Sequence, residues 1–268
     1  MGQNNPKTRR NPNRLAFSKY QGAGNDFLII DDRVPFFPTE DVHLIQRLCH
    51  RRFGIGADGI ILLQNDGMAD FRMQIFNSDG SEAESCGNGL RCLARFIADI
   101  RGESAASYKI WMHDQIVEAF VEKEKISIAL NNPRDLKLHV QQDVHFIDTG
   151  VPHAVVFVAD VQKIDLNQEG KALRSHPCFG PKGSNVNFAS LQSDGSISVR
   201  TFERGVEGET LACGTGAAAV AAIAAQIYNC SGPIRTRFSG GDLEISFSDE
   251  GLKLAGPAVR VFEGTFDF

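Results

Sequence analysis

Residues 213–224 read Cys-Gly-Thr-Gly-Ala-Ala-Ala-Val-Ala-Ala-Ile-Ala. After the first four residues the segment is small and apolar on every side, which predicts a helix enclosed by other structure rather than one on a surface. A sheet wrapped around the helix would enclose it. The stretch therefore indicates a domain in which a curled sheet surrounds one central helix.

A second quartet of the same kind stands 127 positions earlier in the chain. Residues 86–89 read Cys-Gly-Asn-Gly and lead into another predicted helix, residues 90–96. A cysteine at a helix N-terminus lies beside unpaired backbone N–H groups and the positive end of the helix dipole, which stabilise a thiolate. Cys86 and Cys213 are therefore expected to be a matched pair of thiols with lowered pKa values.

Three upstream landmarks indicate that the quartets belong to a longer duplication. Gly22 lies 64 positions before Cys86, and Gly150 lies 63 before Cys213. Gly54 matches Gly183 in the same way, and Phe76-Asn77 matches Phe202-Glu203. The register predicts two halves of similar topology, joined near residues 131–134, where Asn-Asn-Pro-Arg interrupts the pattern.

Most of the remaining chain has the patterns of short strands. Apolar or alternating runs predict strands at residues 27–30, 60–63, 71–76, 126–130, 154–157, 196–202, 243–247 and 252–254. One further helix is expected over residues 39–51, with Thr39 or Asp41 as its cap. The predicted fold class is α+β, with two pseudo-symmetric domains over residues 15–131 and 132–255 after a disordered tail, residues 1–14.

Composition favours a globular protein with a small-molecule partner. The 268 residues are 42% hydrophobic and 23% charged, with a formal charge of −5, so no polybasic surface suggests nucleic acid or an anionic membrane. The N-terminal residues lack a signal-peptide core, and no apolar run is long enough for a membrane span. Six cysteines without C-x-x-C spacing are expected to be reduced in the cytoplasm.

Cofactor and metal motifs are weak. Residues 54–59 match the G-x-G-x-x-G pattern, but a helix is expected before them and a strand after, the reverse of a dinucleotide-binding turn. No lysine stands in a pyridoxal-phosphate context, and the histidines lack metal-site spacing. We therefore expect neither cofactor nor metal. Cys49, Cys92, Cys178 and Cys230 are expected to be core residues.

Two helix N-termini facing each other would bind one carboxylate from both sides, with a thiol on each face of its α-carbon. This arrangement suits removal of an α-proton from one face and return of a proton to the other. The helix ends would stabilise the negative charge that develops on the carboxylate. The pair would titrate as a coupled unit.

The chain closely resembles the diaminopimelate epimerase family over residues 15–268. The resemblance rests on seven ordered motifs, which begin at Gly22, Arg52, Phe76, Cys86, Asn185, Phe202 and Cys213. It implies a cofactor-independent isomerase that interconverts LL- and meso-diaminopimelate on the route to lysine and peptidoglycan precursors. It also implies two pseudo-symmetric domains, with the last strand, residues 256–268, returning to the first; a homodimer is one expected assembly.

Position matching implies roles for individual residues. Cys86 and Cys213 would be the two bases, and the reacting carboxylate would be bound by Gly87, Asn88, Gly214 and Thr215. The far amino-acid end would be held by Asn25, Asn77, Asn185, Glu203 and Arg204, with Arg204 suited to a carboxylate and Glu203 to an ammonium.

Two positions depart from the family pattern. Val151 stands where many members have asparagine, and Gly59 stands where glutamine is common. The loss of two polar contacts would relax substrate selectivity. His153 is retained, either to tune the nearby thiol or as a structural residue.

Three alternatives use the same residues. A proline or hydroxyproline racemase would use the same chemistry, but a cyclic substrate gives Glu203 and Arg204 nothing to bind. A non-catalytic relative would lack two working thiols. A redox protein would be activated when the cysteine pair is oxidised.

Overall fold

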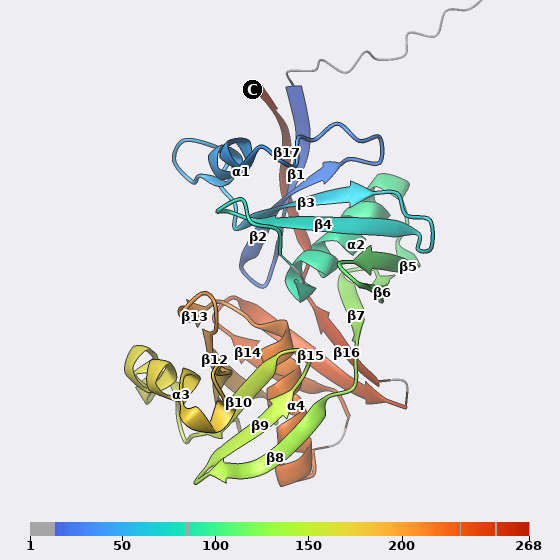
Figure 1. The fold of residues 1–268 in the computed structure, drawn as a ribbon. Coiled ribbons are helices and arrows are strands. Elements are labelled where there is room, and N and C mark those ends of the chain that lie inside the picture. The colour runs from blue at the N-terminus through green and yellow to red at the C-terminus, as the bar shows by residue number, and fades with distance from the viewer. Residues whose placement is uncertain (1–13, 84–85, 231, 250, 268) are drawn as a thin grey trace, which may run out of the picture.

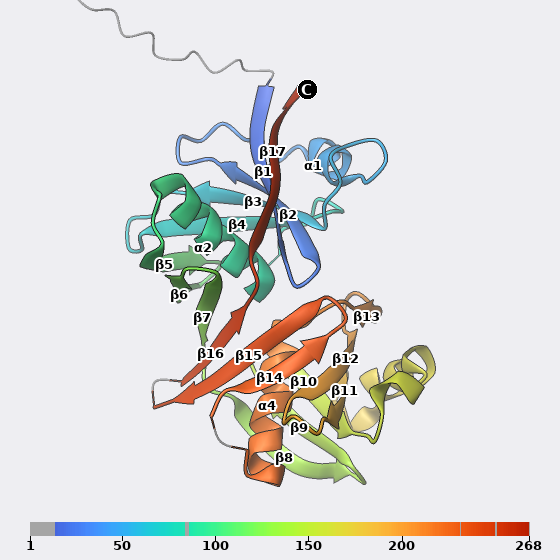
Figure 2. The same cartoon turned by 180° about the vertical axis from the view of Figure 1, so that it is seen from behind.

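The computed structural model describes residues 14–83, 86–230, 232–249 and 251–267. It has two lobes, stacked one above the other in Figure 1 and seen from behind in Figure 2. The predicted tail lies outside the described residues except for Arg14, which begins the first strand.

The first lobe wraps its strands around one long helix. Its strands are β1 (Arg14–Gly22), β2 (Asn25–Asp31), β3 (Gly59–Gln64), β4 (Phe71–Asn77), β5 (Ala105–Met112), β6 (Gln115–Glu122) and β7 (Lys125–Leu130). Its helices are α1 (Val42–Cys49), capped by the Asp41 side chain, and α2 (Gly87–Arg101).

The second lobe repeats the plan. Its strands are β8 (Arg134–Gln141), β9 (Val144–Asp148), β10 (Pro152–Phe157), β11 (Asn185–Leu191), β12 (Ile197–Glu203), β13 (Gly208–Thr210), β14 (Ile234–Phe238), β15 (Gly241–Ser248) and β16 (Gly251–Gly256). Its helices are α4 (Gly214–Tyr228), the short α3 (Lys171–Arg174), 3₁₀ turns at Val161–Lys163 and Pro177–Phe179, and a π-helical turn at Leu166–Gly170.

Strand pairing confirms the predicted fold class and the duplication. In the first lobe β2 pairs with β3 in parallel, β3 with β4 antiparallel, and β4 with β5 in parallel; β6 and β7 follow antiparallel. In the second lobe β10, β11, β12, β14, β15 and β16 repeat this sequence of directions. The equivalent strands β4 and β12 end at Asn77 and Glu203, the two positions matched in sequence.

The lobes are joined by hydrogen-bonded strands as well as by the covalent connection between β7 and β8. β16 pairs antiparallel with β7, and β17 (Val259–Asp267) runs back along β1 (Figure 2). The assignment of residues 15–131 and 132–255 to separate domains stays a proposal.

The predicted central helix of the second lobe is buried as expected. All nine residues from Gly216 to Ala224 are buried, since alanine side chains let the surrounding strands approach closely. The α2 helix instead has one polar side, and its core face includes Leu90, Leu93 and Ile97. Both helices belong to one continuous hydrophobic core, so the two lobes share an interior at the level of the helices.

Candidate active site

Each predicted base is the N-cap of a central helix. The Cys86 sulfur accepts a hydrogen bond from the Gly89 backbone N–H at 3.3 Å, and the Cys213 sulfur accepts one from Gly216 at 3.3 Å. The remaining N–H groups of each first turn have no acceptor within their helix. Gly87, Asn88, Gly214 and Thr215 supply these groups, so the two helix starts have the geometry of paired anion sites.

The glycines in these turns are required by the protein itself. A Cβ at Gly216 would lie 2.5 Å from the Asn187 Oδ1 atom and 3.2 Å from the Cys213 sulfur. The close contact at Gly216 comes from a buried asparagine of β11.

The thiol pKa values differ from the sequence-based expectation. Burial raises the pKa of Cys213 to about 12 and also raises the pKa of Cys86. Backbone N–H groups at both helix starts act in the opposite direction, as expected, but desolvation of the thiolate is the larger effect here. The two groups are within electrostatic reach of each other, because the charge of Cys86 contributes to the rise at Cys213.

Around Cys86 the side chains are amides held by charged groups. The Asn25 Oδ1 atom lies 3.6 Å from the Cys86 sulfur and accepts a hydrogen bond from Asn88 Nδ2 at 3.4 Å. Asn25 Nδ2 donates to Asp58 at 2.8 Å, and Arg91 Nη2 donates to Asn88 Oδ1 at 2.7 Å. The two amides therefore have a fixed orientation, with a carboxylate at one end and a guanidinium at the other.

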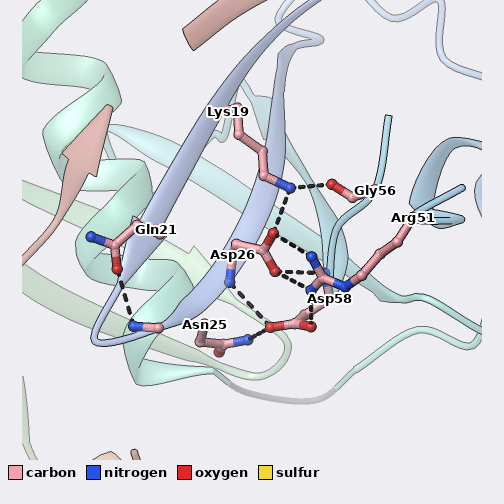
Figure 3. A network of polar contacts seen from close by, with 8 residues as sticks. Lys19, Gln21, Asn25, Asp26, Arg51, Gly56 and Asp58 are labelled. Carbon is pink, nitrogen blue, oxygen red and sulfur yellow. Dashed lines mark hydrogen bonds and ion pairs between the residues drawn. The ribbon is translucent and has the colours of Figure 1, made fainter. Parts of the chain in front are cut away.

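Asp58, which holds the Asn25 amide, is part of a larger ion network (Figure 3). Arg51 contacts Asp26 at 2.6 Å and Asp58 at 2.7 Å, and Lys19 contacts Asp26 at 2.6 Å and also the Gly56 carbonyl oxygen. The cation contacts help to lower the pKa of Asp26 to about 2, against a burial effect that would raise it. Asp26 is therefore ionised at neutral pH, and the network holds the Asn25 turn in place.

Around Cys213 the side chains form an uncharged relay. The Thr201 hydroxyl donates to Asn187 Oδ1 at 2.8 Å, and Asn187 Nδ2 donates to His153 Nδ1 at 3.0 Å and to the Ala154 carbonyl at 3.0 Å. The second ring nitrogen of His153 therefore carries the proton and donates to Thr215 Oγ1 at 3.0 Å.

Thr215 Oγ1 lies 3.5 Å from the Cys213 sulfur and completes this relay. Burial lowers the pKa of His153 to about 3, and the charge of Arg204 acts in the same direction, so the imidazole is neutral. His153 contacts Thr215 rather than the thiol itself. Its connection to Cys213 is therefore through the threonine hydroxyl.

The residues expected to hold the far end of the substrate lie at the ends of equivalent strands. Asn77 ends β4 and donates to the Ser81 hydroxyl at 3.0 Å; Glu203 ends β12, and burial raises its pKa. The charge of Glu203 raises the pKa of both cysteines, so Glu203 lies within electrostatic reach of the two thiols. Asn185 is held by backbone groups, because its amide donates to the Pro152 carbonyl and accepts from the Arg204 N–H.

The two departures from the family pattern have different structural settings. A Cβ at Gly59 would lie 2.4 Å from the Phe76 carbonyl oxygen, so no larger residue fits between these strands as they stand. Val151 is half-buried, and its carbonyl accepts a hydrogen bond from the Thr149 N–H at 3.1 Å. Gly59 is therefore required by β-sheet packing. Of the two departures, only Val151 replaces the amide of the family pattern with an apolar side chain.

The other cysteines only partly match their predicted core positions. Cys49 and Cys92 are buried and Cys230 is half-buried. The prediction for Cys178 was wrong, because the Pro177–Phe179 turn exposes both Pro177 and Cys178 to solvent. The Cys178 sulfur lies 2.9 Å from His176 Nδ1. Residues 54–58 lie between α1 and β3, and Gly59 begins β3, so a helix precedes the glycine pattern and a strand follows it as expected.

Within the described residues, no three His, Cys, Asp or Glu side chains gather as metal ligands. None of the helices described there combines the length and apolar character needed to cross a bilayer.

Sequence analysis missed several residues that position the site. They are Lys19, Asp26, Arg51, Asp58, Arg91, Asn187 and Thr201. For Asn187 a signal was available, because it stands two residues after Asn185 on the same face of a strand. For Arg91 the signal was a charged residue within the apolar start of α2.

Comparison with known proteins supports a single family. The family model described as diaminopimelate epimerase matches residues 17–132 and 145–265. A diaminopimelate epimerase from Flavobacterium psychrophilum is 43% identical over 256 residues, 92% of this chain and 98% of the relative. One from Aquifex aeolicus is 41% identical over 273 residues, 93% of this chain and 97% of the relative.

Solved structures share the fold at low identity. A PhzF-family phenazine biosynthesis protein from Bacillus anthracis has a TM-score of 0.72 at 18% identity, covering 95% of this chain and 99% of its own. A hydroxyproline epimerase from Agrobacterium vitis has a TM-score of 0.68 at 13% identity, covering 96% and 93%. These likenesses show the two-lobed fold alone. With the family model spanning nearly all of both lobes, this chain belongs to the diaminopimelate epimerase family.

Proposed function

We propose that the protein converts LL-2,6-diaminopimelate to meso-diaminopimelate, in the synthesis of lysine and of peptidoglycan precursors. The observation that supports this most strongly is the pair of N-cap cysteines at equivalent helix starts, within electrostatic reach of each other. A stereocentre is inverted when one face loses a proton and the other gains one, and this requires a base on each face.

In the proposed mechanism the first-turn N–H groups of α2 and α4 bind the reacting carboxylate. One cysteine, as thiolate, removes the α-proton, and the electron pair of the broken C–H bond is delocalised into the carboxylate. The N–H groups stabilise the charge that develops there. The opposite cysteine, as thiol, then donates its proton to the other face, so the two sulfurs end with exchanged protonation states.

The far amino-acid end of the substrate would select for diaminopimelate. Glu203 at the end of β12 would accept hydrogen bonds from its ammonium group, and Arg204 would bind its carboxylate. Asn77 and Asn185 complete this proposed subsite, and Asn25 reaches it from the first lobe. Cofactor independence, a cytoplasmic location and a homodimeric state stay predictions.

The test is to incubate purified protein with LL-diaminopimelate, and separately with L-proline, in D₂O. We expect meso-diaminopimelate to appear with solvent deuterium at its α-carbon, and proline to remain unlabelled. Incorporation into proline alone would favour the racemase alternative and overturn the proposed substrate. A Glu203→Gln variant should lose diaminopimelate turnover, with Glu209→Gln as the control because Glu209 pairs with Arg200 on the surface.

A further inference from the structure

Arg91 is a buried cation without a buried anion. None of its surface is exposed, and within the described part of the chain it forms no ion pair. Its Nη2 atom donates to Asn88 Oδ1 at 2.7 Å and Nη1 donates to the Gly87 carbonyl at 3.4 Å, while Nε has no acceptor there. An arginine with so few partners is costly to bury, which suggests that its charge has a use.

The guanidinium lies directly behind the turn that carries Cys86. Both of its hydrogen bonds go to the first two residues of α2, Gly87 and Asn88, which follow the cysteine. Its positive charge acts on the sulfurs of Cys86 and Cys92. Cys92 faces the hydrophobic core, where burial raises the pKa of its thiol to about 12, so Cys86 is the thiol of the site that benefits from the charge.

In α4, which the structure describes in full, no cation stands at the position that matches Arg91. The position equivalent to Arg91 in α4 is Ala218, which is fully buried. The group that supports the first turn of α4 is the neutral imidazole of His153, through Thr215. Among the charges that act on Cys213, the largest contribution after burial comes from the Glu203 carboxylate, which opposes a thiolate.

We infer that Arg91 is a positioning residue that sets the order in which the two thiols ionise, so that Cys86 becomes a thiolate while Cys213 is still a thiol. The inference rests on the proposed two-thiol function and specifies which cysteine starts as the base. Arg91 does so in two ways: its fork holds the Asn88 amide, and its unpaired charge stabilises the adjacent thiolate.

Two contacts with uncharged groups act against the ionisation of Cys86 before Cys213. Asn25 Oδ1 faces the Cys86 sulfur at 3.6 Å and would accept a hydrogen bond from its thiol, while Thr215 can donate to the Cys213 sulfur at 3.5 Å. Hydrogen bonds of sulfur are weak. A full charge in a buried site acts more strongly on a thiolate. The Glu203 carboxylate raises the pKa of both thiols, so the charge of Arg91 is what favours Cys86.

The test measures the ionisation of each cysteine without substrate. The rate of iodoacetamide alkylation is followed against pH, and each cysteine is quantified by peptide mass spectrometry. The midpoint of each profile gives an apparent pKa that does not depend on how accessible the sulfur is. In the unmodified protein we expect Cys86 to ionise at lower pH than Cys213, and the reverse order would overturn the inference.

Variants separate charge from hydrogen bonding. Arg91→Met should raise the Cys86 midpoint by at least about one pH unit, whereas Arg91→Lys, which keeps the charge, should leave Cys86 first to ionise. Arg95→Met is the matched control, because it removes an arginine from the same helix where it pairs with Asp99. Equal midpoints in Arg91→Met and Arg95→Met would contradict the role of Arg91.

The outcome is independent of whether the proposed substrate is correct. If the protein fails to epimerise diaminopimelate but Cys86 ionises first and responds to Arg91→Met, the proposed function fails alone. If epimerisation is normal but the order of ionisation is reversed, the role of Arg91 fails alone. Should Arg91→Met not fold, the order in the unmodified protein and in Arg91→Lys still decides the question.

Discussion

The surroundings of the two thiols differ more than their backbones do. Cys86 and Cys213 each cap a central helix and accept an N–H hydrogen bond at 3.3 Å from the third residue after them. Beyond that turn, the first lobe uses amides fixed by Arg91 and Asp58, while the second uses the uncharged His153 relay. Duplication thus supplies two equivalent positions, and the neighbours make them chemically unequal.

The largest expected effect comes from removing either thiol. Cys86→Ala and Cys213→Ala should each lower the rate of diaminopimelate epimerisation by about 10³-fold or more, because each face of the α-carbon would lose its acid or base. Cys92→Ala, which removes a buried thiol of the same helix, is the control. If either active-site variant kept full turnover, the two-base mechanism would be wrong.

A smaller loss of activity is expected from changes at Glu203 and Asn77, which end equivalent strands of the two lobes. Glu203→Gln should lower kcat/KM for LL-diaminopimelate by about 100-fold, since a buried charged hydrogen bond to the substrate ammonium would be lost. The equivalent change in the first lobe, Asn77→Ala, removes a neutral group and should cost about tenfold. Equal losses would mean that the two strand ends do not contact different groups of the substrate.

Disrupting the hydrogen-bond network behind either thiol should lower kcat by about tenfold, with little effect on KM. Thr201→Val keeps the shape of a buried side chain but releases Asn187, and with it the orientation of His153. Thr236→Val makes the same change at another buried threonine, which donates to the Leu243 carbonyl. A comparable loss of kcat in both variants would assign the effect to general destabilisation.

For the first lobe the corresponding change is Asp58→Ala. It removes the acceptor of the Asn25 amide and one partner of Arg51. Because the opposite end of the amide pair is still held by Arg91, we expect partial loss of kcat, with Asp160→Ala as a control carboxylate outside the site. An unchanged kcat would show that Asn25 needs no fixed orientation.

The last effect needs no substitution and is a dependence on pH. Burial raises the pKa of both thiols, so at neutral pH the doubly protonated pair predominates before substrate binds. The active form needs one thiolate, so kcat/KM should rise continuously between about pH 7 and about pH 9. A decline over this interval would indicate that the second deprotonation, rather than the first, lies within it.

Repetition made the fold predictable from sequence, because the same landmarks recur before Cys86 and Cys213 at nearly the same spacing. The positions of Cys86 and Cys213 at helix starts were predictable because each Cys-Gly-x-Gly quartet leads into an apolar helical segment. Among the positioning residues, Asp58 and Arg51 were not predictable. Asp58 and Arg51 act through Asn25, and such long-range pairing leaves no local pattern in the sequence.

The pKa expectation failed for a related reason. The effect of a helix N-terminus can be inferred from the quartet alone, whereas burial depends on how two lobes close around the sulfurs. Likewise, Gly59 is a departure from a family pattern in sequence, but in the fold it is the residue that lets β3 approach the Phe76 carbonyl.

The most direct test of the two-thiol account is the position of deuterium after brief turnover of LL-diaminopimelate in D₂O. If separate thiols work on opposite faces, the meso product should carry one solvent deuterium at the inverted carbon from the first turnover, while recovered LL substrate stays unlabelled at low conversion. Product that keeps the original proton, or equal labelling of both isomers from the start, would contradict the account.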